Sequence, residues 1–389
     1  MKKLFLLIAI TFILPVMSFA DKKTEQFAVL IGTNNVAKIE EALKGGANVN
    51  GGSGDKAMTP LMIASQNDES LDVVKLLIKY GAKVNETNTK GETALYLAAQ
   101  KATNVDILKA LIEAGADLNA RTKDQMTPLM VAAGENFKSA VTETLLKAGA
   151  RVDDKDIDGR TPLIFAVTYN ENPTVTEALL KSGADSNSKN RYGLPVIMMA
   201  AQSNKNADVL RILIENGADC NVLLQGVFNP MSYAAIYNPN PAIIEILHKQ
   251  GLSVTDYNAN GVSPFLYACF YNFSSEVTQK FLDLGADPKQ TDKNGISALM
   301  YAAMHNGNPE IIHILTKAGA DVNAKDETNG LTPLMLAALQ NEHSTIITAL
   351  LEDGADINLK SKADMTAYEY AMKNESPISK LDVVQELEP

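Results

Sequence analysis

Histidine and cysteine, the side chains that most often carry chemistry or bind transition metals, are scarce in this 389-residue chain. There are only four histidines and two cysteines. No histidine lies at metal-ligand spacing from another histidine or a cysteine, so the sequence predicts no metal site. The histidines, which we expect to be surface or packing residues, are His248, His305, His313 and His343.

Two polar segments partly resemble ligand-binding motifs. Residues 51–56, Gly-Gly-Ser-Gly-Asp-Lys, are rich in glycine but lack the Gly-Lys-Ser/Thr ending of a phosphate-binding loop. Asp154, Asp156 and Asp158 alternate as in a calcium loop, but the glycine and final glutamate of such a loop are missing. Aspartates at these positions also suit tight turns. Because no catalytic constellation is found elsewhere, we predict neither a cofactor nor an enzyme.

Aromatic side chains are concentrated in the middle of the chain, where residues 160–275 hold 12 of the 23. We assign Phe165, Phe265 and Tyr267 to the core. Six others align with exposed positions, and aromatic residues are enriched where protein interfaces bind most strongly. They are predicted to form a protein-binding surface, or alternatively to pack between neighbouring units: Tyr169, Tyr192, Phe228, Tyr237, Phe270 and Tyr271.

The first 20 residues have the pattern of a cleavable secretory signal. They begin Met-Lys-Lys, continue with an apolar run over residues 4–16, and end Ser-Phe-Ala. The apolar run is too short to span a bilayer, which needs roughly 20 residues. We therefore predict export to the periplasm or the outside of a bacterial cell, with a mature chain that begins at Asp21 and does not insert into the membrane.

The charge balance argues against one class of partner. The chain has 35 basic and 46 acidic residues, a net charge of −11. Because an acidic surface repels the phosphate backbone, we exclude nucleic acid as the expected partner.

Two motifs recur in register over most of the chain. The first is Thr-Pro-Leu-Met at residues 59–62 and 127–130, with variants at the same 34-residue spacing. The second is Gly-Ala-Asp, as at residues 115–117 and 183–185. Thr followed by Pro is typical of a helix start, and Gly of a helix end. Each unit is therefore predicted to be a pair of helices that buries its apolar face only by stacking on its neighbours.

The combined run Gly-x-Thr-Pro-Leu, Ala-Ala, Leu-Leu and Gly-Ala-Asp-x-Asn resembles the ankyrin repeat over nearly the whole mature chain. The resemblance implies an all-α solenoid of helix-turn-helix units joined by hairpin-like loops. We predict a signal peptide (1–20), an N-terminal capping unit (21–56), nine full repeats of about 34 residues (57–363) and a partial C-terminal capping unit (364–389).

The sequence departs from the ankyrin pattern in three ways. The histidine that usually follows Thr-Pro-Leu is replaced throughout, for example by Met62. The period is 34 rather than 33, with the extra residue expected in the turn between the two helices. At the helix start, Pro195 and Asn229 replace Thr; Asn can cap a helix and Pro cannot.

The repeat spacing also bears on the two cysteines. Cys220 and Cys269 fall two units apart, roughly 15–20 Å if packed helices are 8–10 Å apart. A disulfide needs Cα atoms within about 7 Å. We therefore expect two free, buried cysteines.

The resemblance implies protein binding through the hairpin tips and the exposed face of the first helix. We predict an exported, non-enzymatic scaffold for a protein partner that the sequence does not identify. An inhibitor or immunity-type protein that blocks a cognate enzyme or toxin in the cell envelope is the alternative, since its acidity would match a basic target.

Overall fold

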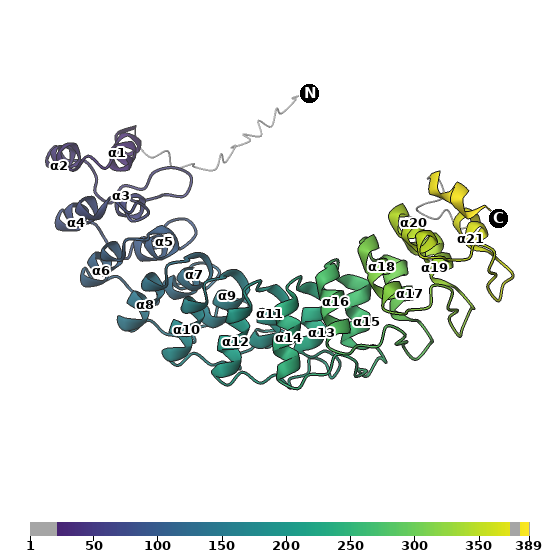
Figure 1. Ribbon diagram of the computed structural model, residues 1–389. Helices are drawn as coiled ribbons and strands as arrows, with labels where there is room; N and C mark the ends of the chain where they lie inside the picture. Colours follow the sequence, from purple (N-terminus) through teal and green to yellow (C-terminus); the bar gives the residue numbers. More distant parts are fainter. Residues whose placement is uncertain (1–21, 374–381, 389) are drawn as a thin grey trace, which may run out of the picture.

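The computed structural model describes residues 22–373 and 382–388 and shows pairs of antiparallel helices stacked into an arc (Figure 1). The first helices of the pairs are α1 (Lys22–Gly32), α3 (Pro60–Ala64), α5 (Ala94–Lys101), α7 (Pro128–Glu135), α9 (Pro162–Tyr169), α11 (Val196–Ser203), α13 (Pro230–Tyr237), α15 (Pro264–Tyr271), α17 (Ala298–His305), α19 (Pro333–Gln340) and α21 (Ala367–Lys373). The second helices are α2 (Val36–Lys44), α4 (Leu71–Lys79), α6 (Val105–Glu113), α8 (Ser139–Lys147), α10 (Pro173–Lys181), α12 (Ala207–Glu215), α14 (Pro241–Lys249), α16 (Ser275–Asp283), α18 (Pro309–Lys317) and α20 (Ser344–Glu352), followed by the 3-10 helix η1 (Asp382–Leu387).

The helices form two layers, because first helices pack on first helices and second helices on second helices. In the N-terminal half of the arc the first helices lie on its inner side, whereas α16, α18 and α20 lie on the inner side near the other end (Figure 1). The stack therefore twists along its length. Between the layers runs one continuous apolar core, whose largest fully buried side chains include Phe265 and Phe281. The predicted all-α solenoid is confirmed.

The helix starts follow the predicted capping chemistry. The hydroxyl of Thr127 accepts a hydrogen bond from the Met130 backbone amide, and Thr or Ser does the same at most other first helices. Asn229 also caps its helix, accepting from Ser232. Pro195 makes no side-chain cap, as expected. At the other end of the second helix, glycines such as Gly81 (φ +88°) turn the chain in the left-handed conformation.

A ladder of buried asparagines occupies the turn between the two helices, at the end of the first helix of seven consecutive units. Each side-chain amide donates to two backbone carbonyls of the preceding unit over 2.8–3.1 Å, one of them the carbonyl of the preceding ladder residue or its equivalent. All seven are at most 4% exposed. The members of this asparagine ladder are Asn136, Asn170, Asn204, Asn238, Asn272, Asn306 and Asn341.

The loops that join successive units are tight turns closed by one side chain. In the loop before α9, for example, Asp156 Oδ1 accepts from the backbone amides of Asp158 and Arg160, over 2.9 and 2.7 Å. Neighbouring turns are also joined by single backbone hydrogen bonds, such as that from Arg191 to Asp158. Within the described residues, no bond of this kind joins the turns between Arg191 and Lys362.

Both cysteines are free and buried. Cys269 is fully buried in α15, and burial raises the pKa of its thiol, so the side chain is an inert apolar group of the core. The predicted signal peptide lies outside the described residues.

Candidate protein-binding surface

Two positions of each first helix from α5 to α19, the fourth and the eighth residue, carry the side chains of the candidate surface. They are one helical turn apart and therefore share a face. Small or aliphatic residues at the fourth position, such as Leu97 and Met199, are buried. Tyrosine at the same position is only half-buried, because its longer ring reaches the surface, as with Tyr233 and Tyr267.

Three consecutive units carry aromatic side chains at both positions, which makes a continuous surface. The pairs are Tyr233 with Tyr237 on α13, Tyr267 with Tyr271 on α15, and Tyr301 with His305 on α17. Phe228, in the turn before α13, and Phe270 fill the spaces between them. We call these eight residues the aromatic surface: Phe228, Tyr233, Tyr237, Tyr267, Phe270, Tyr271, Tyr301 and His305.

Ring contacts connect all eight members. Phe228 bridges two helices, with ring centroids 6.1 Å from Tyr233 and 5.7 Å from Tyr267. Phe270 joins the next pair, stacking on His305 at 4.8 Å and meeting Tyr271 edge-on at 4.6 Å. Tyr237 and Tyr271 remain 56% and 43% exposed, so the rings form a surface rather than a second core.

The aromatic surface contains almost no formal charge. Residues 220–244 and 257–275 include no Asp, Glu, Lys or Arg. The nearest carboxylate contact is made by Asp292, which accepts a hydrogen bond from the Tyr301 hydroxyl over 3.2 Å. Burial, followed by the charge and hydrogen bond of Asp292, raises the pKa of Tyr301, so this phenol stays protonated and donates.

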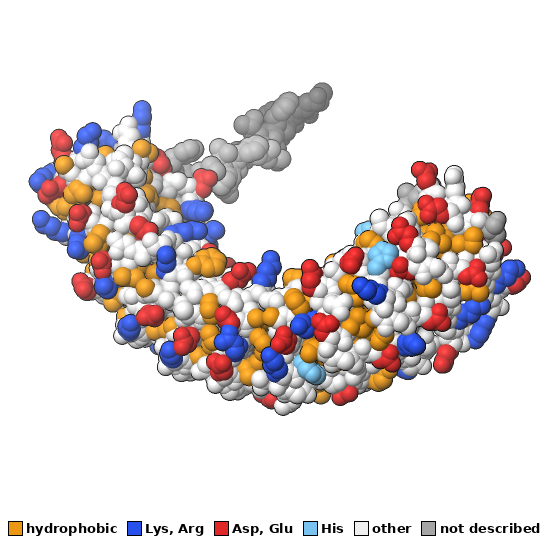
Figure 2. Space-filling view, viewed as in Figure 1, with side chains coloured by type: hydrophobic (Ala, Val, Ile, Leu, Met, Phe, Trp, Pro, Cys, Tyr) orange, Lys and Arg blue, Asp and Glu red, His pale blue; other side chains and the backbone are white. Residues whose placement is uncertain are grey.

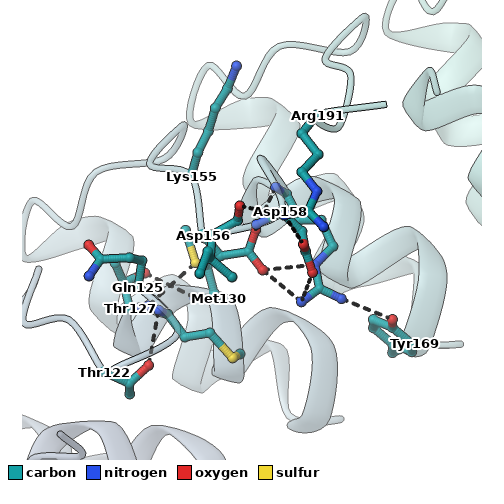
Figure 3. Close-up of polar contacts among 12 residues, drawn as sticks. Thr122, Gln125, Thr127, Met130, Lys155, Asp156, Asp158, Tyr169 and Arg191 are labelled. Atoms are coloured by element: carbon teal, nitrogen blue, oxygen red, sulfur yellow. Dashed lines mark hydrogen bonds and ion pairs between the residues drawn. The ribbon is translucent and has the colours of Figure 1, made fainter. Parts of the chain in front are cut away.

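The unit of α9, two repeats before α13, has aromatic residues at the same pair of positions but a different arrangement. Phe165 and Tyr169 of α9 are covered by Arg160, whose guanidinium lies 4.6 Å from the Phe165 ring centroid. That guanidinium donates to Asp156 Oδ2 over 2.8 Å from Nε and to the Tyr169 hydroxyl over 3.4 Å (Figure 3). A cavity of about 520 Å³ between α7 and α9 opens beside this pair.

Tyr192 lies apart from both groups, at the tip of the turn before α11. It is 69% exposed, and Arg191 stacks on its ring at 4.7 Å while also pairing with Asp158 over 3.0 Å. The six residues predicted from sequence therefore fall into two regions. Phe228, Tyr237, Phe270 and Tyr271 belong to the aromatic surface, whereas Tyr169 and Tyr192 are each in contact with an arginine.

Comparison with known proteins explains this arrangement of paired helices. The family profile described as "Ankyrin repeats (3 copies)" matches residues 26–122, 104–190, 197–292, 265–361 and 299–387, which together span most of the chain. The chain belongs to the ankyrin repeat family. Repeats of this family generally serve as non-catalytic scaffolds for protein interactions.

Among solved structures, the ankyrin array is similar to the human ASB11 ankyrin repeat domain. The two are 25% identical with a TM-score of 0.51, and the match covers 59% of this chain and 99% of that one. No curated protein sequence matched the array.

Four members of the aromatic surface were not placed in the predicted binding surface by the sequence analysis. Tyr267 is not core as expected but half-buried, since its hydroxyl reaches out to Asn258, which donates to it over 3.0 Å. Tyr233 and Tyr301 occupy the equivalent position, and His305 follows Tyr271 by 34 residues. That spacing was the available signal: it places His305 in the same row as Tyr237 and Tyr271.

Within residues 22–373 and 382–388, no three His, Cys, Asp or Glu side chains come together in a way that could hold a metal ion. In the same residues, every helix is too short or too polar to cross a lipid bilayer. Acidic and basic side chains are interspersed over the face seen in Figure 2.

Proposed function

We propose that this chain is an exported, non-enzymatic scaffold that binds a protein partner through the aromatic surface, with Tyr169 and Tyr192 as a second contact region. The observation that carries the proposal is the row of exposed rings on three consecutive first helices. Exposed, contiguous apolar patches on soluble proteins usually mark contact sites, and tyrosine is among the residues that dominate binding energy.

Affinity capture tests this proposal. The mature chain, residues 21–389, is used to capture its partner from the exported fraction of the source cells, and the partner is identified by mass spectrometry. Replacing Tyr237 and Tyr271 together by Ala should weaken binding by about 2 kcal/mol or more, the scale of an interface hot spot. The melting temperature should change little, because both rings are substantially exposed.

The chain offers a matched control at the same position of a neighbouring helix. Ser203 ends α11 just as Tyr237 ends α13, so Ser203→Ala alters the row without removing a ring. We expect this variant to bind as the parent chain does. Unchanged binding by the double tyrosine variant would refute the aromatic surface as the contact site.

Export is part of the proposal and has its own test. A chain expressed with residues 1–20 should be recovered from the periplasm or the medium, starting at Asp21. A chain without them should remain in the cytoplasm. Recovery of the full chain, uncleaved, in the cytoplasm would contradict the proposal.

An inhibitor or immunity-type protein is the second candidate, and the distribution of charge favours considering it. Residues 295–389 contain 14 acidic but only 6 basic residues, so the C-terminal part would attract a basic target. This candidate predicts a captured partner that is an enzyme or toxin, that loses activity in the complex, and that associates more slowly as salt is raised.

A further inference from the structure

The unit around α9 already holds an arginine against its ring pair, Phe165 and Tyr169. Arg160 precedes the capping Thr161, stacks on Phe165 and pairs with Asp156, which lies five residues before Thr161. The guanidinium therefore contacts both an aromatic face and a carboxylate. This combination suits arginine, whose planar cation stacks on rings and forms directional ion pairs.

The unit around α17 has an aspartate and an aromatic residue at the same two positions but no arginine. Asp292 lies five residues before the capping Ser297, and its Oδ1 accepts from the backbone amides of Asn294 and Ile296 over 2.9 Å each. Tyr301 replaces Phe165. The position of Arg160 is held by Ile296, so Asp292 Oδ2 receives the hydroxyl of Tyr301 and the side-chain amide of Asn294 instead of a guanidinium.

The surroundings of Asp292 favour a cation from outside the chain. The rings of Tyr267 and Tyr271 from the preceding unit stand against each other at 6.5 Å, and Phe270 meets Tyr301 edge-on at 5.6 Å. Aromatic faces carry negative electrostatic potential, and residues 257–275 provide no cation to neutralise it. In the part of the chain that the structure describes, lysine and arginine stack on none of these rings, so the carboxylate beside them is complementary to a positive charge.

We infer that an arginine side chain of the partner polypeptide binds between Tyr301 and the stacked pair Tyr267 and Tyr271, with its guanidinium on the rings and paired with Asp292. This inference rests on the proposed protein-binding function and names the chemistry of the segment that the aromatic surface accepts. Arg160 on Phe165 is the internal example of the same contact.

The experiment uses 3-fluorotyrosine-labelled full chain and ¹⁹F NMR, with resonances assigned from Tyr267→Phe, Tyr271→Phe and Tyr301→Phe. The probes are acetyl-Gly-Gly-Arg-Gly-Gly-amide and the same peptide with citrulline, an uncharged isostere of arginine. We expect the arginine peptide to shift these three resonances, and the citrulline peptide to bind at least about fivefold more weakly.

Two substitutions matched to other units sharpen the test. Asp292→Asn removes the charge but keeps the turn, because Asn258 closes the equivalent turn with the same pair of backbone bonds. It should weaken the arginine peptide about fivefold. Ile296→Arg introduces the equivalent of Arg160 and should abolish peptide binding by filling the site. Thermal melts of both variants report whether the fold is retained.

Three results would overturn the inference: equal binding of the two peptides, unchanged binding by a folded Ile296→Arg variant, or no shift of these tyrosines by the arginine peptide. None of them would refute the proposed function, since the aromatic surface would then bind an uncharged segment. The aromatic surface itself is refuted as the contact site by a different result, unchanged binding of the captured partner by the Tyr237 and Tyr271 double variant.

Discussion

Three threonines in the second helices are buried with no hydrogen-bond partner for their hydroxyl groups. Thr142, Thr176 and Thr278 are fully buried, and they occupy a position where other units have Val, Leu or Ile. A buried polar group without a partner lowers stability, because it loses its hydrogen bond to water on folding. The hydroxyls are therefore local weaknesses in an otherwise apolar layer.

Replacing such a threonine by valine should stabilise the protein. Thr142→Val keeps the shape and removes the unpaired hydroxyl, so we expect the free energy of unfolding to rise by about 1 kcal/mol. The matched control is Thr127→Val, where the hydroxyl caps α7 and its loss should cost about 1 kcal/mol. Denaturant titration measures both. A loss of stability in Thr142→Val would contradict the assignment of an unpaired hydroxyl.

At the scale of single elements, the turn between the two helices depends on the asparagine ladder. Asn238 donates to the carbonyls of Ala201 and Asn204 and accepts from the Asn240 amide. Asn238→Ala leaves these three buried or half-buried groups without their partner and should cost about 3 kcal/mol of unfolding free energy. Asn260, exposed at a hairpin tip, is the control, and Asn260→Ala should change stability by less than about 0.5 kcal/mol.

Asp68, in the turn after α3, accepts hydrogen bonds from the turn after α5, and these bonds make the stability of the protein depend on pH. Partial burial would raise the pKa of Asp68, but hydrogen bonds from the Thr103 hydroxyl and the amides of Thr103 and Asn104 together hold it below its ordinary value. A depressed carboxyl pKa adds stability above the unfolded value, about 4, and this is lost as pH falls through the folded value. The unfolding free energy of Asp68→Asn should therefore fall less than that of the parent between about pH 5 and 2. Equal losses would contradict this role.

The sequence was sufficient to predict the helices and turns of each unit but not the side-chain contacts between neighbouring units. The caps, the glycine helix ends and the 34-residue period follow from residue types that act within one unit, as at Thr127 and Gly81. The asparagine ladder was missed because asparagine in a turn is expected for local reasons, whereas Asn238 bonds to residues 34 and 37 positions away. Tyr267 was misassigned because periodicity identifies a helix face but not how far a long side chain extends beyond it.

For the whole molecule, the cooperativity of the stack is expected to be lowest around α11 and α13. Pro195 leaves α11 without a side-chain cap, and among the described residues the backbone bonds between successive turns are missing from the turn after Arg191 until Lys362. Because each unit is stabilised mainly by its neighbours, one weak junction lowers the cost of opening locally. Hydrogen exchange should therefore be faster at residues 190–235 than in the units around α7 and α19. Best protection in residues 190–235 would refute this weak junction.

The stability of truncated chains should depend on the end from which units are removed. Removing the units before Asn204 takes away the carbonyls of Val167 and Asn170 that its amide binds, so the new first unit loses the bonds that fix its turn. Removing the units after it leaves these bonds in place. We expect chains shortened from the C-terminus to remain more stable than chains shortened by as many units from the N-terminus. Thermal melts of the two series measure the difference, and equal stabilities would contradict it.

The backward reach of the asparagine ladder also suggests an order of assembly. Every ladder amide donates to carbonyls of a part of the chain that is synthesised earlier. Each newly synthesised unit can therefore form the hydrogen bonds of its turn with the folded unit before it, and these bonds need no residue that is synthesised later. A protein built in this way can fold unit by unit from its N-terminus while the rest of the chain is still being made.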